Sequence, residues 1–300
     1  MTKVLWNIES ILNWTESYLK KFCPNSPRLD AELLLSSVLK CPRLDLYLRA
    51  DKPLNKRELD AFREMIKKRS NGCPIAYLTG EKEFWSLKLE VNKNTLIPRP
   101  DTETLVEHTL IQIREWQEKN PQSTCQIAEL GTGTAAIPLS LCSELKNIRI
   151  ISVDCNNKIL KLASRNINRY NSLLKPRNNI VQLIKSDLFS SIDPTLKLDF
   201  IVSNPPYIPS KNIEDLQLEI SKFEPRIALD GGQDGLNFYR YLLETGSGLL
   251  KSNGEMLLEI GSFRESELES LLNKNRLWAS SCIFKDLQGN NRVWNLKKKN

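Results

Sequence analysis

The strongest constraint on the fold is an alternation of strand-like and helix-like segments that begins at Cys125 and continues almost to the end of the chain. Short apolar runs are separated by longer runs with helical periodicity, and this order specifies an open, largely parallel β-sheet covered by helices on both faces. We therefore predict an α/β fold. The predicted strands are Cys125–Leu130, Ile148–Val153, Ile180–Ile184, Leu198–Val202, Glu255–Ile260, Ser280–Lys285 and Arg292–Leu296, and the predicted helices are Thr102–Lys119, Ala135–Leu145, Lys158–Tyr170, Leu236–Leu250 and Arg264–Asn273.

The first part of the chain has a different pattern. Apolar residues recur at helical spacing in two early stretches, and a third helical stretch, Asn55–Ser70, is stopped by Asn71-Gly72. The segment Phe84–Val91 then alternates apolar and polar residues, which is typical of a strand or hairpin. We expect a helical domain over residues 1–75, a β-hairpin linker over residues 76–100 and an α/β domain over residues 101–300.

The composition fits a globular protein. Of the 300 residues, 40% are hydrophobic and 26% are charged, which excludes a disordered, collagen-like or coiled-coil chain. At an average of roughly 150 residues per domain, a chain of this length is expected to form two domains. No apolar run approaches the roughly 18 residues that cross a membrane, and Glu9 precedes any signal-like apolar region. We therefore expect a cytoplasmic protein with no membrane partner.

Histidine and cysteine usage excludes several kinds of site. His108 is the only histidine, so a site with several histidine ligands is impossible and a Ser-His-Asp triad could form only around this residue, which we expect to be structural. The seven cysteines are scattered and never in Cys-x-x-Cys spacing, so neither a disulfide framework nor a metal site is indicated. The net charge of +7 comes partly from Lys297–Lys299 and does not by itself favour nucleic acid as a direct substrate.

A glycine-rich turn, Gly131–Ala135, lies between the first predicted strand and the following helix. Glycines there permit a tight turn and a close approach of a ligand, and the helix beyond supplies unpaired N–H groups. Asp154 ends the second predicted strand, where a carboxylate can accept hydrogen bonds from both hydroxyls of a ribose. Together these features predict a cofactor that contains a nucleoside. The alternative is a tight turn and a strand-end Asp with no ligand.

The predicted strand Leu198–Val202 leads directly into Ser203 and then Asn204–Tyr207, with the sequence Asn-Pro-Pro-Tyr. The carboxyl edge of an open α/β sheet is where ligands bind. The prolines lack N–H groups, so nearby carbonyls can face a ligand, while the asparagine offers an acceptor oxygen and an NH2 donor. Such a site suits a planar amide or amine that must be aimed at an electrophilic methyl group. The alternative is a simple turn that ends the strand.

These features together resemble the class I S-adenosylmethionine-dependent methyltransferases that act on planar nitrogen. Within that class, longer motifs resemble the peptide chain release factor glutamine methyltransferases, the HemK or PrmC family. The resemblance extends over nearly the whole chain and implies a seven-stranded Rossmann-like methyltransferase domain preceded by a small all-helical domain and joined to it by a β-hairpin. The motifs that carry it are Pro74–Gly80, Glu83–Trp85, Leu96–Glu103 and Glu224–Leu236.

The resemblance also implies a reaction. A methyl group would pass from S-adenosyl-L-methionine to the side-chain amide nitrogen, N5, of the glutamine in the Gly-Gly-Gln motif of class 1 release factors, and the helical domain would hold the release factor. By position, the implied cofactor-binding residues are Gly131, Thr132, Gly133, Thr134, Ala135, Asp154, Asp187, Leu188 and Asn204, and the residues implied to hold the glutamine amide are Asn204, Pro205, Pro206 and Tyr207.

Four positions are harder to interpret. Ala135 stands where the family usually has a third glycine, and Glu129 stands where Asp is commoner. One added methyl group is compatible with a helix start at negative φ, so we expect cofactor binding to survive. Arg99 and Glu103 could position the cofactor and the domain hinge, or they could cap the helix that begins near Thr102.

The chemistry should rest on positioning, because an amide nitrogen is a poor nucleophile and the motifs contain no obvious strong base. Tyr207 is expected to pack against the amide plane. Three alternatives remain. They are an adenine-N6 nucleic-acid methyltransferase, a glutamine methyltransferase for a ribosomal protein, and a nucleoside-binding scaffold or basic RNA-associated module that binds S-adenosylmethionine without turnover. The first should carry a basic, aromatic-rich recognition region, which the sequence lacks. Methyl-transfer assays separate the others.

Overall fold

The structure is a computed structural model of the whole chain and describes residues 6–23, 25–261, 265–273 and 275–300. The chain forms two compact units. The first takes in residues up to Glu81 and also Gln217–Phe223, and the second comprises Lys82–Leu216 and Glu224–Asn300. The chain therefore leaves the second unit once, to add a short segment to the first.

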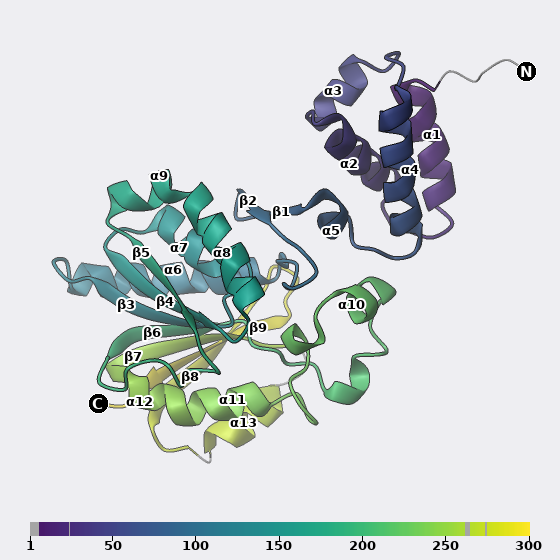
Figure 1. Cartoon of the computed structure of the whole chain (residues 1–300). Helices are drawn as coiled ribbons and strands as arrows, with labels where there is room; N and C mark the ends of the chain where they lie inside the picture. Colours follow the sequence, from purple (N-terminus) through teal and green to yellow (C-terminus); the bar gives the residue numbers. More distant parts are fainter. Residues whose placement is uncertain (1–5, 24, 262–264, 274) are drawn as a thin grey trace, which may run out of the picture. The chain divides into compact units, whose positions relative to one another are not determined.

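The first unit is helical (Figure 1). Asn7 and Asn55 start α1 and α4 with capping boxes, in which each asparagine side chain accepts a hydrogen bond from the backbone three residues later. Leu34, Leu35 and Phe62 are fully buried in its core. The helices are α1 (Ile8–Leu19), α2 (Pro27–Leu39), α3 (Arg43–Leu48), α4 (Lys56–Ser70), α5 (Ile75–Thr79) and α10 (Leu218–Phe223).

A buried arginine ties α10 to this unit. Arg69 of α4 forms ion pairs with Asp30 of α2 at 2.7 Å and with Glu219 of α10 at 2.6 Å. Only 6% of Arg69 is exposed. A buried guanidinium is stable only with carboxylate partners, and these two ion pairs connect α2, α4 and α10.

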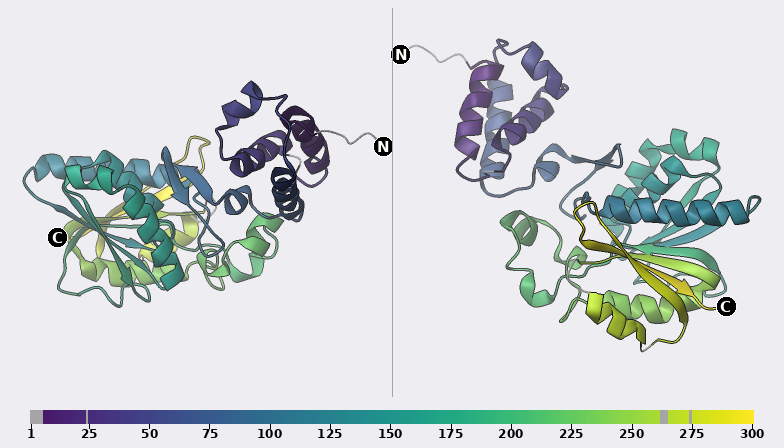
Figure 2. Two further views of the ribbon diagram at one scale, coloured as in Figure 1. Left: turned by 45° about the horizontal axis from the view of Figure 1, so that its top comes forward. Right: turned by 180° about the vertical axis from the view of Figure 1, so that it is seen from behind.

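The second unit contains a seven-stranded sheet in the order β5-β4-β3-β6-β7-β9-β8. The first five strands of this order are parallel, whereas β9 is antiparallel to both of its neighbours; Figure 2 shows the antiparallel pair in yellow. The strands are β3 (Cys125–Leu130), β4 (Ile148–Asp154), β5 (Ile180–Lys185), β6 (Leu198–Ser203), β7 (Leu250–Glu259), β8 (Trp278–Lys285) and β9 (Asn291–Lys298). The prediction of a largely parallel α/β sheet is confirmed.

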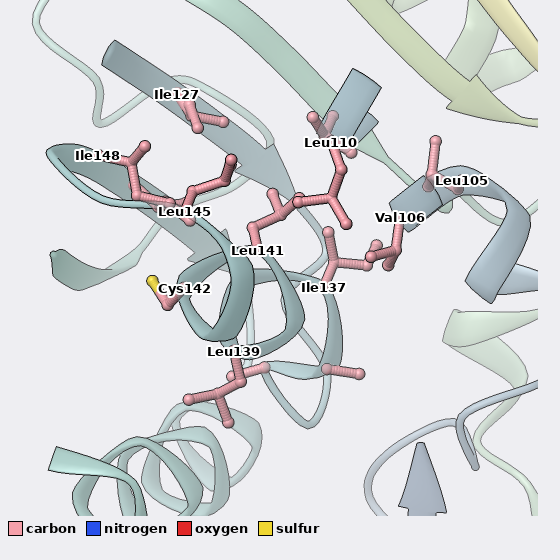
Figure 3. Close-up of a cluster of buried hydrophobic side chains, with 14 of the residues drawn as sticks. Leu105, Val106, Leu110, Ile127, Ile137, Leu139, Leu141, Cys142, Leu145 and Ile148 are labelled. Carbon is pink, nitrogen blue, oxygen red and sulfur yellow. The ribbon is translucent and has the colours of Figure 1, made fainter. Parts of the chain in front are cut away.

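Helices cover both faces of the sheet (Figure 1). Successive strand residues point to opposite faces, so Ile127 belongs to the core under α6 and α7, while Ala128 belongs to the core on the other face. Figure 3 shows the first core, in which Leu141 and Leu110 approach the sheet. The helices are α6 (Thr102–Lys119), α7 (Ala136–Glu144), α8 (Asn157–Arg169) and α9 (Asn171–Leu174) on one side and α11 (Asn237–Tyr241), α12 (Ser247–Leu249) and α13 (Glu265–Asn273) on the other.

The predicted helix Leu236–Leu250 differs from the structure. A π-helical turn, Leu242–Gly246, separates α11 from α12, and Leu250 already belongs to β7. Gly246 lies against the Met256 side chain, where an added Cβ would come within 2.3 Å of the Met256 methyl carbon. The π-helical turn thus packs closely against β7 at Gly246. The predicted start of the next helix, Arg264, lies outside the described residues.

A β-hairpin opens the second unit. Its strands, β1 (Glu81–Phe84) and β2 (Leu87–Glu90), are joined by Trp85 and Ser86, both at positive φ. Two-residue hairpin turns of this kind usually carry Asn or Gly. Here Glu103 Oε1 accepts a hydrogen bond from the Trp85 backbone N–H at 3.0 Å, which stabilises the turn from α6.

Two further observations concern expectations drawn from the sequence. Within the part of the chain that the structure describes, no helix is both long and apolar enough to cross a bilayer. His108 stacks on Phe284 with ring centroids 3.9 Å apart, and burial lowers its pKa. This packing agrees with the expected structural role of His108.

Candidate active site

A cavity of about 620 Å³ opens at the carboxyl ends of the parallel strands in the second unit. This is the edge where open α/β sheets bind ligands. Most of the residues proposed from sequence line it, although they come from four strand ends and from the segment before α6. They are Arg99, Glu129, Gly131, Thr132, Gly133, Thr134, Asp154, Asp187, Leu188, Asn204, Pro205 and Pro206.

The glycine-rich turn forms one wall of the cavity. Gly131 and Gly133 have φ of +80° and +54°, values that a side chain makes costly. A Cβ at either position would meet nothing within 4 Å, so the missing side chains leave open space at the wall. The Gly131 and Thr132 backbone N–H groups donate to the Val153 carbonyl at 3.0 and 3.1 Å, which fixes the turn against β4. Such a cradle fits the close approach of a nucleoside cofactor.

The expectation of a negative φ at Ala135 is wrong. Its φ is +63° in the left-handed region, and it precedes α7 as its N-cap residue. The Ala135 N–H donates to the Thr132 carbonyl at 2.8 Å, which closes the turn before α7. The side chain is fully buried and does not line the cavity. The position therefore suits glycine, and alanine occupies it at some cost in backbone strain.

Asp154 ends β4 and is held by the backbone. Its Oδ2 accepts from the Gly133 N–H at 3.3 Å and its Oδ1 accepts from the Asn156 N–H at 3.2 Å. Burial raises its pKa, and these hydrogen bonds act in the opposite direction. Asp187 and Leu188 follow β5 on the same edge, and Leu188 has a φ of +52°. The Asp154 carboxylate is therefore connected to the glycine-rich turn by a hydrogen bond.

Glu129 is a buried acid near the end of β3. Only 2% of it is exposed, and burial raises its pKa to about 8, with the nearby charge of Asp154 acting in the same direction. At neutral pH its carboxyl is therefore mostly protonated and can donate a hydrogen bond.

The Asn204–Pro206 segment forms the facing wall. Asn204 Nδ2 donates to Thr102 Oγ1 at 3.0 Å. The backbone of Gly231 lies against this segment, and a Cβ on Gly231 would come within 2.8 Å of the Pro206 carbonyl oxygen. Glycine is needed there because two backbones pass so closely.

Besides Ala135, two more predicted residues do not line the cavity. Tyr207 packs against the core on the α11 side of the sheet, and burial together with the charge of Glu259 raises its pKa to about 12. Glu103 instead binds the hairpin turn, as described above. The structure thus places Glu103 at a structural contact rather than on the cavity wall.

Arg99 lines the cavity and pairs with a buried acid. Its guanidinium contacts the carboxylate of Glu224, whose other oxygen accepts from the Ile97 N–H at 3.3 Å. Glu224 is only 6% exposed. The ion pair joins the segment before α6 to the segment after α10.

Sequence reasoning missed Thr102 and Glu259 as site residues. Thr102 lies inside the quoted motif Leu96–Glu103 and holds Asn204. Glu259 is 1% exposed at the end of β7, and burial raises its pKa to about 7, opposed by the charge of Arg292. An acid at the end of an apolar strand is the signal that identified Asp154, and it was available for Glu259 as well.

The doubly covered sheet, the glycine-rich turn and the strand-end acid define a class I methyltransferase. The sequence matches the PrmC N-terminal domain over residues 10–80 and the methyltransferase small domain over residues 110–221. It is 34% identical to the release factor glutamine methyltransferase of Rhodopirellula baltica, over 98% of this chain and 97% of that protein. It is 36% identical to the enzyme of the same name from Pasteurella multocida, over 93% and 95%. The chain belongs to the release factor glutamine methyltransferase family.

Solved structures support the fold alone. The hMettl16 catalytic domain, in complex with MAT2A 3′UTR hairpin 6, aligns with a TM-score of 0.54 at 14% sequence identity, covering 79% of this chain and 82% of that one. At this level of identity, the similarity extends to the architecture of the sheet and its helices.

Proposed function

We propose that the chain transfers a methyl group from S-adenosyl-L-methionine to the N5 amide nitrogen of the glutamine in the Gly-Gly-Gln motif of class 1 peptide chain release factors. The observation that carries this proposal is the placement of Asn204–Pro206 on the wall of the same cavity as the glycine-rich turn and Asp154. A site for a planar amide thus faces a site for a nucleoside. Since release factors work in translation, we place the protein in the cytoplasm, with no membrane or direct nucleic-acid partner.

The residues around the turn would hold the cofactor. Gly131–Ala135 would lie along its methionine part, the Asp154 carboxylate would accept hydrogen bonds from the ribose hydroxyls, and Asp187 and Leu188 would flank the adenine. Ala135 would act here only through the backbone, because its side chain is buried away from the cavity. When bound, S-adenosyl-L-methionine supplies an electrophilic methyl group on a sulfonium.

The facing wall would hold the acceptor. Asn204 Oδ1 and the Pro205 carbonyl would accept the two hydrogens of the glutamine NH2 group, which orients the nitrogen and increases its electron density. Among the described residues that line the cavity there is no histidine or lysine. Catalysis would therefore rest on orientation, and the proton would leave after the nitrogen has gained its methyl group. Tyr207 could support this wall from behind.

The helical domain, residues 1 to about 75, would bind the folded release factor. Large apolar side chains on its surface offer contact area, notably Trp14 (45% exposed), Phe22 (50%) and Leu48 (74%). Contacts far from the reacting atoms can be used to orient the glutamine. A short Gly-Gly-Gln peptide lacks those contacts, so it should be a much poorer acceptor than the intact protein.

The test is transfer of a labelled methyl group to a purified class 1 release factor. We expect label on the wild-type factor and none on a variant in which alanine replaces the glutamine of the Gly-Gly-Gln motif. Adenine-containing DNA and a ribosomal protein serve as competing acceptors in parallel reactions. Labelling of either competitor in preference to the release factor would refute the proposed substrate, and cofactor binding without any transfer would indicate a scaffold.

A further inference from the structure

Ile227 is an exposed apolar side chain on the wall of the cavity. It lies in a short helical turn, Arg226–Ala228, and 57% of it is exposed although it lines the cavity. A single exposed isoleucine is ordinary on a protein surface and by itself needs no explanation. The position of this one on the cavity wall, in a segment that is anchored on both sides, points to a role in binding.

The chain just before Ile227 is anchored by Glu224. The Glu224 carboxylate contacts the Arg99 guanidinium and accepts a hydrogen bond from the Ile97 N–H at 3.3 Å. Glu224 is buried, and breaking a buried ion pair of this kind is costly. The ion pair therefore fixes the point from which the turn of Ile227 begins.

The chain just after Ile227 is anchored by Asp230. Its Oδ1 accepts from the Ser210 hydroxyl at 2.6 Å and from the Gly232 N–H at 3.0 Å. Its Oδ2 accepts from Arg226 Nε at 3.2 Å. Because the backbone is held on both sides and a β-branched side chain has few rotamers, the Ile227 side chain has little freedom to move away from the cavity.

Backbone pairing connects the turn of Ile227 to the acceptor wall. The Ile208 N–H donates to the Leu229 carbonyl at 3.0 Å, and the Gly231 N–H donates to the Ile208 carbonyl at 2.9 Å. Ile208 directly follows Asn204–Tyr207, the segment proposed to hold the glutamine amide. Leu229 is buried, whereas Ile227 is left exposed in the cavity. Ile227 thus belongs to the acceptor wall and not to the wall formed by the glycine-rich turn.

We infer that Ile227 restricts the acceptor to a glutamine that is preceded by glycine. This inference rests on the proposed function, which supplies the Gly-Gly-Gln acceptor. To reach Asn204, the glutamine side chain must extend into the cavity, and this brings its backbone close to the wall that carries Ile227. A glycine can pass closely over a rigid isoleucine because it has no Cβ, whereas a larger residue would collide with the Ile227 side chain.

The first experiment measures kcat/KM for two acceptor peptides, one with Gly-Gly-Gln and one with Gly-Ala-Gln. Both peptides lack the contacts of a folded release factor, so the ratio of their kcat/KM values reports on the cavity alone. The wild type is compared with Ile227→Ala and with Ile111→Ala, which shortens an exposed isoleucine of α6 outside the cavity. Calorimetry should give the same cofactor Kd for all three proteins.

We expect the wild type and Ile111→Ala to prefer the Gly-Gly-Gln peptide by roughly tenfold to a hundredfold, which is the scale for one carbon atom in a shaped pocket. Ile227→Ala should reduce this preference to about threefold or less, mainly because the Gly-Ala-Gln peptide becomes a better acceptor. The same preference in all three proteins would overturn the inference. If the wild type labels no release factor, the proposed function itself is wrong.

The second experiment needs no turnover. The Cδ1 methyl signal of Ile227, identified by its absence in Ile227→Val, is followed by NMR in isotope-labelled enzyme as each peptide is added without cofactor. We expect the Gly-Gly-Gln peptide to shift this signal and the Gly-Ala-Gln peptide to do so only at roughly tenfold higher concentration or above. The Ile111 signal should move with neither peptide. An Ile227 signal that neither peptide moves, or that both move at the same concentration, would overturn the inference.

Discussion

The two walls of the cavity are built by different means. On the β3 and β4 side, backbone groups make the contacts: Thr132 N–H donates to the Val153 carbonyl, and Gly133 N–H donates to Asp154. Most of these partners are within about one strand–helix–strand unit of each other. A short motif in the sequence therefore carries much of the geometry of this wall.

On the β6 and β7 side, side chains make the contacts, and their partners are far apart in sequence. Asn204 binds Thr102, 102 residues away, and Arg99 binds Glu224, 125 residues away. The first wall is thus defined by backbone conformation and the second by a network of polar side chains. Substitutions on the first wall should therefore mainly change the cofactor Kd, and substitutions on the second wall should mainly change kcat.

The largest difference between the effect on kcat and the effect on the cofactor Kd is expected for Asn204→Ala. This change removes the proposed acceptor of the glutamine NH2 group, an interaction that acts during transfer. We expect kcat to fall by at least roughly a hundredfold, with the cofactor Kd changed much less. Steady-state kinetics with release factor and calorimetric titration with cofactor measure the two quantities.

A matched control for this change is Asn168→Ala, at an exposed position of α8 outside the cavity. It should leave both kcat and the cofactor Kd unchanged. If Asn204→Ala weakens cofactor binding as much as it slows turnover, the two walls do not have separate roles.

Asp154→Ala, on the first wall, should mainly weaken cofactor binding. It removes a carboxylate proposed to bind the ribose and also the acceptor of the Gly133 and Asn156 N–H groups. Each lost charge-assisted hydrogen bond contributes about 1.5–3 kcal/mol, so the cofactor Kd should rise roughly tenfold to a hundredfold. Calorimetry against Asp193→Ala, an exposed aspartate in a turn, provides the comparison. An unchanged Kd would remove Asp154 from the cofactor site.

This difference between the walls also explains what the sequence could predict. The periodicity of the sheet strands and the glycine-rich turn are local patterns, so β3 and α6 were predicted with their observed bounds. The pairing of Asn204 with Thr102 depends on tertiary structure and has no local signature. The positive φ of Ala135 was missed because alanine rarely adopts it. The segment Gln217–Phe223 was missed as part of the first unit because Arg69 and Glu219 are joined only by folding.

Glu129→Gln tests the buried acid of the first wall through stability. Burial raises the pKa of Glu129 in the folded protein from the ordinary 4.5 to about 8, so the folded state keeps a proton that the unfolded state releases between these values. Stability is therefore greatest below the lower value and falls as the pH rises toward the higher one. We expect the wild type to lose of the order of 2 kcal/mol more than Glu129→Gln between about pH 6 and about pH 8. The control is Glu115→Gln, which removes an exposed glutamate of α6. The free energy of unfolding of all three proteins is measured in urea without cofactor at several pH values. If it changes equally with pH in all three, the assignment is wrong.

The smallest expected effect tests whether backbone conformation alone sets the first wall. Ala135 has a positive φ, whereas its neighbour Ala136 begins α7. Left-handed geometry costs an alanine roughly 1–2 kcal/mol, and glycine avoids this cost but loses roughly 0.5–1 kcal/mol through its freer unfolded chain. Ala135→Gly should therefore be neutral or stabilising by less than about 1 kcal/mol, with unchanged cofactor affinity, because the lost methyl group does not line the cavity. Ala136→Gly makes the same chemical change in a helix and should destabilise by about 1 kcal/mol. Urea unfolding of both variants measures the contrast; if Ala135→Gly destabilises as much as Ala136→Gly, the buried methyl group matters more than the backbone strain.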